Sequence, residues 1–114
     1  MDKLKKYTDE IGYVFGSEDL CVHLYSWVKM IKPRQVLEFG TGLGASTLWM
    51  GEAIKENGAG ILHTIDDGRI FLEAAEIVGL PQRSYEDYIV DIYNRFDIHD
   101  GVTFYRCLVK DFYT

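Results

Sequence analysis

The residues of this sequence whose types and spacing could support chemistry are alternating glycines that lie near acidic residues. Gly40, Gly42 and Gly44 follow an apolar run and precede a helical pattern. Glycines between a strand and a helix permit positive φ and let a ligand approach backbone N–H groups at the positive end of the helix. The spacing predicts a site for a nucleotide-like ligand.

Two ligand classes compete for this turn. Gly40, Gly42 and Ala45 satisfy the dinucleotide pattern G-x-G-x-x-G/A, and Asp66 follows at about the distance of a ribose-binding acid. Glu38, two positions before the first glycine, would repel a pyrophosphate and attract an ammonium or a sulfonium. Glu38 therefore favours a cationic ligand, and the first half of an NAD(P)-binding Rossmann domain stays as an alternative.

The segment from Glu38 to Gly44, EFGTGLG, resembles the first motif of the class I S-adenosylmethionine-dependent methyltransferases, acid-x-Gly-x-Gly-x-Gly. The wider text, VLEFGTGLGAST followed by HTIDD, looks most like the small-molecule O-methyltransferase branch. The resemblance runs from about Glu18 to the end of the chain. It implies S-adenosyl-L-methionine as the cofactor and a small-molecule methyl acceptor in the complete protein.

The resemblance also implies roles for single residues. Glu38 would face the methionine amino group, Ser46 would bind the methionine carboxylate, and Asp66 would accept hydrogen bonds from the ribose hydroxyls. For Asp67 the sequence favours a helix cap. The cofactor-binding set is Glu38, Gly40, Thr41, Gly42, Gly44, Ser46, Asp66 and Asp67.

The match to the family weakens after the third predicted strand, where adenine would be contacted. Asp111 is a weak candidate there, and backbone groups of Leu108 or Val109 are the alternative. The catalytic base and any metal-binding acids of the O-methyltransferase branch would lie outside this sequence. The chain alone is therefore expected to be inactive, and its catalytic residues stay unassigned.

The histidines offer little further chemistry. His63 falls inside a predicted strand as a packed residue, and His99 lies in a solvated turn between Asp97 and Asp100. Such triplets of Asp and His residues are common in loops, so no metal site is predicted. No arrangement of serine, cysteine and histidine for nucleophilic catalysis is found.

Composition limits the partners. The 114 residues carry 18 acidic and 12 basic side chains, a net charge of −6, which argues against nucleic-acid binding. Neither a membrane span nor a signal peptide is found, so a cytoplasmic protein is expected. Cys21 and Cys107 are then buried thiols, although a disulfide between them stays open. Lys3, Lys5 and Lys6 are expected on a solvated, frayed end.

The chain divides into an extension over 1–16, a leading helix over 17–32 and a βαβααβ core over 35–114, which together form one partial domain. Strands are predicted over 35–40, 61–65 and 102–107. Ser17, Asp67 and Ser84 are predicted to cap helices, and Asn57-Gly58 and Gly79 to end them. The predicted apolar stripes of the first, third and fourth helices are Leu20, Leu24, Trp27, Val28 and Ile31; Ile70, Phe71, Ala74, Ile77 and Val78; and Tyr85, Tyr88, Ile89, Ile92, Tyr93 and Phe96.

Strands that alternate with helices predict an α/β, Rossmann-like parallel sheet with flanking helices. The resemblance to the methyltransferase family implies that this sheet is truncated after the third strand, with order 3-2-1. The first strand, central in the complete family fold, would then lie at an edge. Such an edge invites pairing with another chain, so a homo-oligomer or a paired partner is expected. A non-catalytic remnant or interaction module that self-associates is the alternative function.

Overall fold

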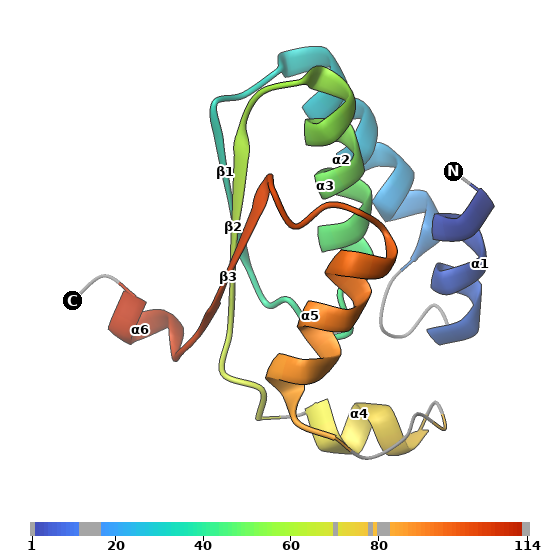
Figure 1. Ribbon diagram of the computed structural model, residues 1–114, viewed down its shortest axis with the longest axis vertical. Coiled ribbons are helices and arrows are strands. Elements are labelled where there is room, and N and C mark those ends of the chain that lie inside the picture. The colour runs from blue at the N-terminus through green and yellow to red at the C-terminus, as the bar shows by residue number, and fades with distance from the viewer. Residues whose placement is uncertain (1, 12–16, 70, 78, 80–82, 113–114) are drawn as a thin grey trace.

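Three parallel strands and the helices that connect them make up the fold of the computed structural model (Figure 1). The structure describes residues 2–11, 17–69, 71–77, 79 and 83–112. The elements are α1 (Asp2–Ile11), α2 (Glu18–Ile31), β1 (Gln35–Phe39), α3 (Ala45–Asn57), β2 (Ile61–Asp66), α4 (Phe71–Ile77), α5 (Tyr85–Arg95), β3 (Val102–Arg106) and α6 (Val109–Phe112).

The sheet has β2 at its centre, with β1 and β3 as parallel neighbours on either side. This is the predicted α/β architecture, and the order 3-2-1 is the same order read from the opposite edge. The register places Glu38 beside Thr64 and Asp66 beside Arg106. Because all three strands run the same way, their carboxyl ends meet at one edge of the sheet, where ligands bind in open α/β folds.

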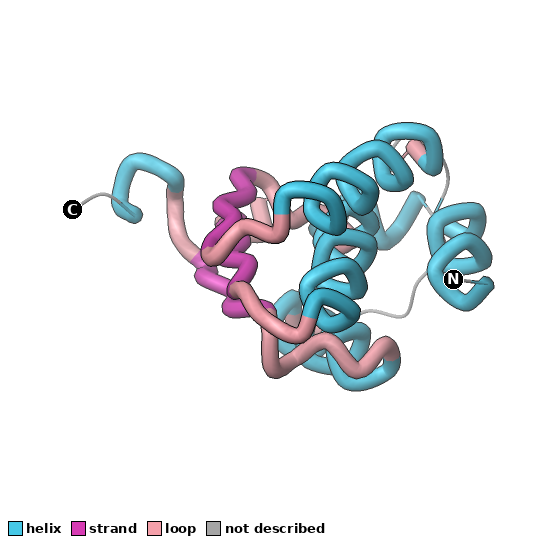
Figure 2. Tube along the Cα trace, turned by 90° about the horizontal axis from the view of Figure 1, so that it is seen from above, coloured by secondary structure: helices cyan, strands magenta, loops and turns pink. Residues whose placement is uncertain are grey.

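The helices cover the two faces of the sheet unequally. Figure 2 shows the large helices on one side and the short helix α6 on the other. The core lies on the covered side, where α3 packs against β2 and α2 and α1 pack against α3. Burial along β1 therefore alternates, and Leu37 and Phe39 are 45% and 47% exposed. None of the helices in the described part of the chain has the length and apolar character that a membrane crossing needs.

The helix ends follow local chemistry. The Ser17 side chain accepts a hydrogen bond from the Leu20 N–H, and the Ser84 side chain accepts one from the Asp87 N–H. Gly58 ends α3 in the left-handed conformation, and its N–H donates to the Ile54 carbonyl. The predicted roles of Ser17, Ser84 and Gly58 are therefore confirmed, because each of these residues satisfies backbone groups within one turn.

The amino-terminal segment differs from the expected frayed extension. Helix α1 buries four side chains, Leu4, Tyr7, Thr8 and Ile11. The Trp49 indole Nε1 donates to Thr8 Oγ1 at 2.9 Å and joins this helix to α3. The lysines at positions 3, 5 and 6 are exposed, as expected. The spacing of the four buried residues is helical, and the surrounding polar residues obscured it.

Two helix faces also differ from prediction. In α2 the buried residues are Cys21 and Val28, whereas Leu20, Trp27 and Ile31 are at least 50% exposed. In α4, Phe71 is buried but Ile77 is 68% exposed. Asp67 lies too far upstream to cap α4, and its carboxylate accepts from the Arg69 N–H instead. Of the remaining predicted α4 stripe, Ile70, Val78 and the side chain of Ala74 lie outside the described residues.

Candidate functional site

The turn between β1 and α3 has the backbone that its glycines predict. Gly40, Gly42 and Gly44 have φ values of +95°, +57° and +88°, a region that other residues rarely adopt. A Cβ added at Gly40 or at Gly42 would meet nothing within 4 Å, whereas one at Gly44 would come within 2.6 Å of Ile92 Cδ1. Gly44 therefore allows close packing on α5, and the first two glycines leave open space above the turn.

Glu38 sits at the base of this turn among hydroxyl groups. Its Oε1 accepts from Thr64 Oγ1 at 2.6 Å and from Thr47 Oγ1, and its Oε2 accepts from Ser46 Oγ. Thr64 also bonds the Thr41 hydroxyl at 2.6 Å. An ionised carboxylate offers about four acceptor positions. Three of those on Glu38 are filled by the protein, and one is left for another donor.

Burial raises the pKa of Glu38 above its ordinary value, and the nearby Asp66 charge adds to the rise. The three hydroxyl donors act in the opposite direction, because they stabilise the ionised form, but burial outweighs them. A positive charge brought next to Glu38 would favour the ionised form. The site therefore gains electrostatically from a cationic ligand.

Asp66 ties the glycine turn to the end of β2. Its Oδ2 accepts from the Gly42 N–H at 2.9 Å, and its Oδ1 accepts from the Gly68 N–H at 2.7 Å. Each oxygen is thus fixed by one backbone donor and keeps capacity for a second. A carboxylate held in this way is a positioned acceptor for a pair of neighbouring hydroxyls.

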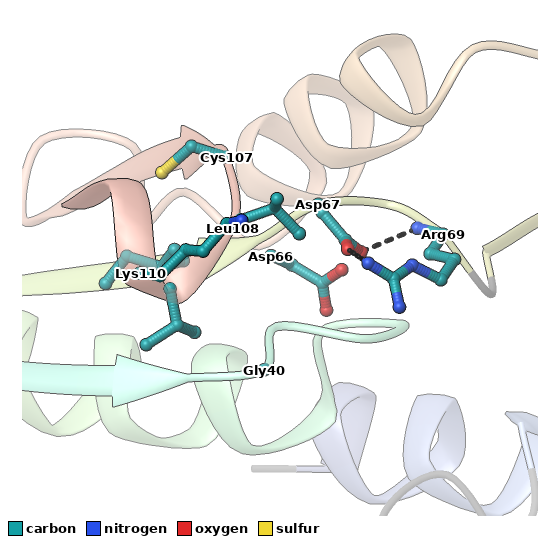
Figure 3. A pocket seen from close by; sticks show the side chains of 9 residues that line it. Gly40, Asp66, Asp67, Arg69, Cys107, Leu108 and Lys110 are labelled. Atoms are coloured by element: carbon teal, nitrogen blue, oxygen red, sulfur yellow. Dashed lines mark hydrogen bonds and ion pairs between the residues drawn. The ribbon is translucent and has the colours of Figure 1, made fainter.

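A cleft of about 410 Å³ opens at the carboxyl ends of the three strands (Figure 3). This volume falls within the ~300–1,000 Å³ of small-molecule sites. We call it the carboxyl-end cleft. Its lining residues are Gly40, Ile65, Asp66, Asp67, Arg69, Cys107, Leu108, Val109 and Lys110. Acidic groups come from the end of β2 and the residue after it, basic groups come from Arg69 and Lys110, and apolar groups come mainly from the segment after β3.

The predicted site residues fall into two connected groups. Gly40, Asp66 and Asp67 line the carboxyl-end cleft. The side chains of Glu38 and Ser46 belong to the hydroxyl cluster at the base of the turn. The Gly42–Asp66 and Thr41–Thr64 hydrogen bonds join the two groups across β1 and β2.

Two cleft residues also serve the local structure. Asp67 forms an ion pair with Arg69, with Oδ2 and Nη2 3.2 Å apart.

Leu108 and Val109, the backbone candidates for adenine, line the cleft. Asp111 is exposed on α6 and is not among the lining residues.

The two histidines considered from the sequence, His63 and His99, do not line the carboxyl-end cleft. His63 Nδ1 lies 3.0 Å from the Tyr105 hydroxyl on the less covered face of the sheet. His99 is exposed beside Asp97 and Asp100. Within the described ranges, no group of three or more potential ligands is placed to hold a metal ion.

Both cysteines are free, but they differ in burial. Cys21 is 1% exposed, and burial raises the pKa of its thiol to about 11. Cys107 is only half-buried and lines the carboxyl-end cleft, so the prediction that it is buried was wrong. It follows the last residue of β3, where the core no longer covers the chain.

Sequence reasoning missed Thr47 and Thr64, the two threonines that bond Glu38. Thr64 could have been found from the register, because it is the in-register partner of Glu38 and such partners point to the same side of a sheet. Thr47 follows Ser46 in the first turn of α3, next to the end of β1. A carboxylate that faces the core needs nearby donors, and these residues supply them.

Comparison with known proteins gives no assignment. No protein-family model matches the chain, and no curated protein matches it significantly. Its function must therefore be argued from the site.

Proposed function

We propose that this chain is the S-adenosyl-L-methionine-binding half of a methyltransferase that acts on a small molecule in the complete protein. The observation that carries the proposal is the pairing of two carboxylates across one glycine turn. Glu38 lies at its base with a raised pKa and one acceptor position left. Asp66 is fixed at the carboxyl-end cleft by two backbone donors.

The residues present fit this cofactor. Glu38 would meet the positively charged methionine end, whose ammonium and sulfonium compensate a buried carboxylate. Asp66 would accept from the two ribose hydroxyls with its remaining positions. Leu108 and Val109 offer an apolar wall for adenine. The open space above Gly40 lets the cofactor approach the backbone.

Bound S-adenosyl-L-methionine would supply an electrophilic methyl group on its sulfonium. The residues of this chain would bind and orient the cofactor, which accounts for the alignment part of catalysis. Deprotonation of the acceptor is assigned to residues outside this sequence, so this chain by itself is proposed to bind without turnover. The two free cysteines fit a reducing cytoplasm, which is the compartment we propose.

Calorimetry with S-adenosyl-L-methionine, S-adenosylhomocysteine and NAD tests the proposal. We expect both sulfur-containing ligands to bind and NAD to bind at least about tenfold more weakly. Glu38→Gln and Asp66→Asn should each weaken binding by about tenfold or more. The matched control is Asp100→Asn, which removes an exposed acid at the opposite end of the sheet.

The outcomes separate the competing functions. Tight binding of NAD would favour a dinucleotide-binding Rossmann half. Binding of none of the three ligands would contradict the proposal and favour an interaction module. If the Glu38 variant lowers the thermal stability and leaves binding unchanged, this residue only stabilises the turn.

We also propose that the chain associates through β1. This strand is an edge of the three-stranded sheet, and its Leu37 and Phe39 side chains are nearly half exposed. Exposed apolar edge strands favour pairing with another chain. Sedimentation should then show a dimer or larger species that Leu37→Lys shifts toward monomer. Val90→Lys, at an exposed apolar position on α5, is the control, and a monomeric wild type would contradict this proposal.

A further inference from the structure

Tyrosine hydroxyls hold the glycine turn from the helical side. The Tyr85 hydroxyl donates to the Gly42 carbonyl at 2.6 Å. The Tyr7 hydroxyl donates to the Leu43 carbonyl and also contacts the Tyr88 hydroxyl, which lies 3.4 Å from the same carbonyl. Two consecutive carbonyls of the turn are thus bound by side chains that come from α5 and α1.

These tyrosines are themselves fixed by packing. Tyr7 and Tyr85 are 4% and 2% exposed. The Tyr85 ring lies between Phe71 and Phe104, at centroid distances of 4.7 and 5.3 Å, and the Tyr7 ring meets Phe96 edge-on at 5.6 Å. Burial raises the pKa of both hydroxyls, so they stay protonated donors at neutral pH.

The turn needs such restraint. Its glycines have no side chains to pack, and ordering a glycine costs more conformational entropy than ordering other residues. The N–H groups of Gly42 and Gly44 are bound by Asp66 and by the Thr41 carbonyl. Because a peptide unit is planar, fixing the Gly42 and Leu43 carbonyls also fixes the N–H directions of the following residues.

We infer that Tyr85 and Tyr7 are positioning residues for the ligand site: their hydroxyls hold the Gly42–Leu43 segment, and the Gly42 N–H in turn fixes Asp66 at the carboxyl-end cleft. This inference rests on the proposed function for the identity of the ligand. A preorganised turn spares the ligand the cost of ordering it. Through Tyr7, the docking of α1 becomes a condition for tight binding.

Tyr→Phe variants test this with little change in packing. Tyr85→Phe and Tyr7→Phe remove one hydroxyl each. Tyr93→Phe is the matched control, because Tyr93 lies on α5, is 5% exposed, and has a hydroxyl without a hydrogen-bond partner among the described residues. Amide hydrogen exchange of the ligand-free full chain reports on the turn, and calorimetry with S-adenosylhomocysteine reports on binding.

We expect exchange across residues 41–45 to rise about tenfold in Tyr85→Phe and in Tyr7→Phe, and to stay unchanged in Tyr93→Phe. The affinity for S-adenosylhomocysteine should fall several-fold in the first two variants only. A general loss of stability would raise exchange in β2 as well, so exchange confined to the turn separates positioning from mere structural support.

Unchanged exchange of the turn in both variants would overturn the inference. Faster exchange with an unchanged affinity would also overturn it, because the turn would then be held without serving the ligand. A wild type that does not bind the ligand refutes the proposed function, and it also refutes the cofactor role assigned to the two tyrosines. Exchange alone would then show only whether the hydroxyls hold the turn. The two substitutions lie on different helices, so if one variant fails to fold, the other still tests the inference.

Discussion

The two ends of the sheet carry clefts of similar size whose glycines have different structural roles. The carboxyl-end cleft measures about 410 Å³, and a cleft near the amino ends of β2 and β3 measures about 370 Å³. We call the second the amino-end cleft; it is lined by Gly58, Gly60, Gly101, Asp97 and Asp100 among others. Both contain glycines and acids, so volume and composition alone do not distinguish them.

The difference lies in why each glycine is required. At the amino-end cleft, a Cβ on Gly60 would come within 2.7 Å of the Pro33 carbonyl oxygen, and one on Gly101 within 3.0 Å of Ile54 Cγ2. These glycines allow the chain to pack on itself. At the carboxyl-end cleft, a Cβ on Gly40 would meet nothing within 4 Å. Gly58, at the amino-end cleft, has open space too, but it is the left-handed residue that ends α3. Gly40 ends no helix and has no packing neighbour, so its positive φ favours the carboxyl end as the place where a ligand would bind.

The largest expected effect is on stability at the amino-end cleft. Gly60→Ala combines a φ of +109° with a backbone clash. We expect a loss of about 3 kcal/mol and a fall in the melting temperature of roughly 10 °C or more, measured by calorimetry. The affinity of the folded variant for S-adenosylhomocysteine should be unchanged. A stable variant would show that this glycine is not needed for packing.

A smaller effect on stability and a clear effect on binding are expected at the carboxyl-end cleft. Gly40→Ala places a methyl group in open space at a φ of +95°, which should cost about 1–2 kcal/mol of stability. The same methyl group should weaken S-adenosylhomocysteine binding by about tenfold, as titration calorimetry would measure. If Gly40→Ala and Gly60→Ala change the affinity equally, the contrast between the two ends fails.

The smallest expected effect is a pH dependence that comes from Glu38. Because burial raises the pKa of this carboxyl in the folded state, its contribution to stability is present below the ordinary glutamate pKa and is lost as pH rises through the raised value. Binding of S-adenosyl-L-methionine has the opposite sign, since the cation favours the ionised form. Affinity should therefore fall as the pH is lowered through the raised pKa of Glu38.

Glu38→Gln supplies the control for this prediction, because it removes the titrating group and keeps the shape of the side chain. Its affinity should be weak and nearly independent of pH. A wild-type affinity that does not change with pH would mean that the cofactor does not depend on the charge of Glu38.

Local signals in the sequence predicted the parts of the fold that depend on local chemistry. Ser17, Ser84 and Gly58 satisfy backbone groups within one turn, so their roles can be read without knowing the tertiary structure. The alternation of helices and strands predicted the parallel sheet, and the family resemblance implied the order of its strands. The glycine spacing around Gly40 likewise predicted a turn with positive φ.

Features that depend on distant partners were not predictable in the same way. The face that α2 buries is set by its packing against α3, which leaves Trp27 exposed despite its helical spacing. Thr64 joins the Glu38 cluster only because two strands pair in one register. The link from Tyr7 to the turn spans 36 residues, and no pattern within α1 indicates it.

The hydrogen bond between Trp49 and Thr8 allows tryptophan fluorescence to report on the docking of α1. Trp49 is 2% exposed and bonds a residue of α1, whereas Trp27 is 50% exposed on α2. Iodide should quench the emission of Trp27 and leave that of Trp49 nearly intact while α1 stays docked. Release of α1 would bring water to the second indole and shift its emission to the red, so the state of the amino-terminal helix can be followed without any label.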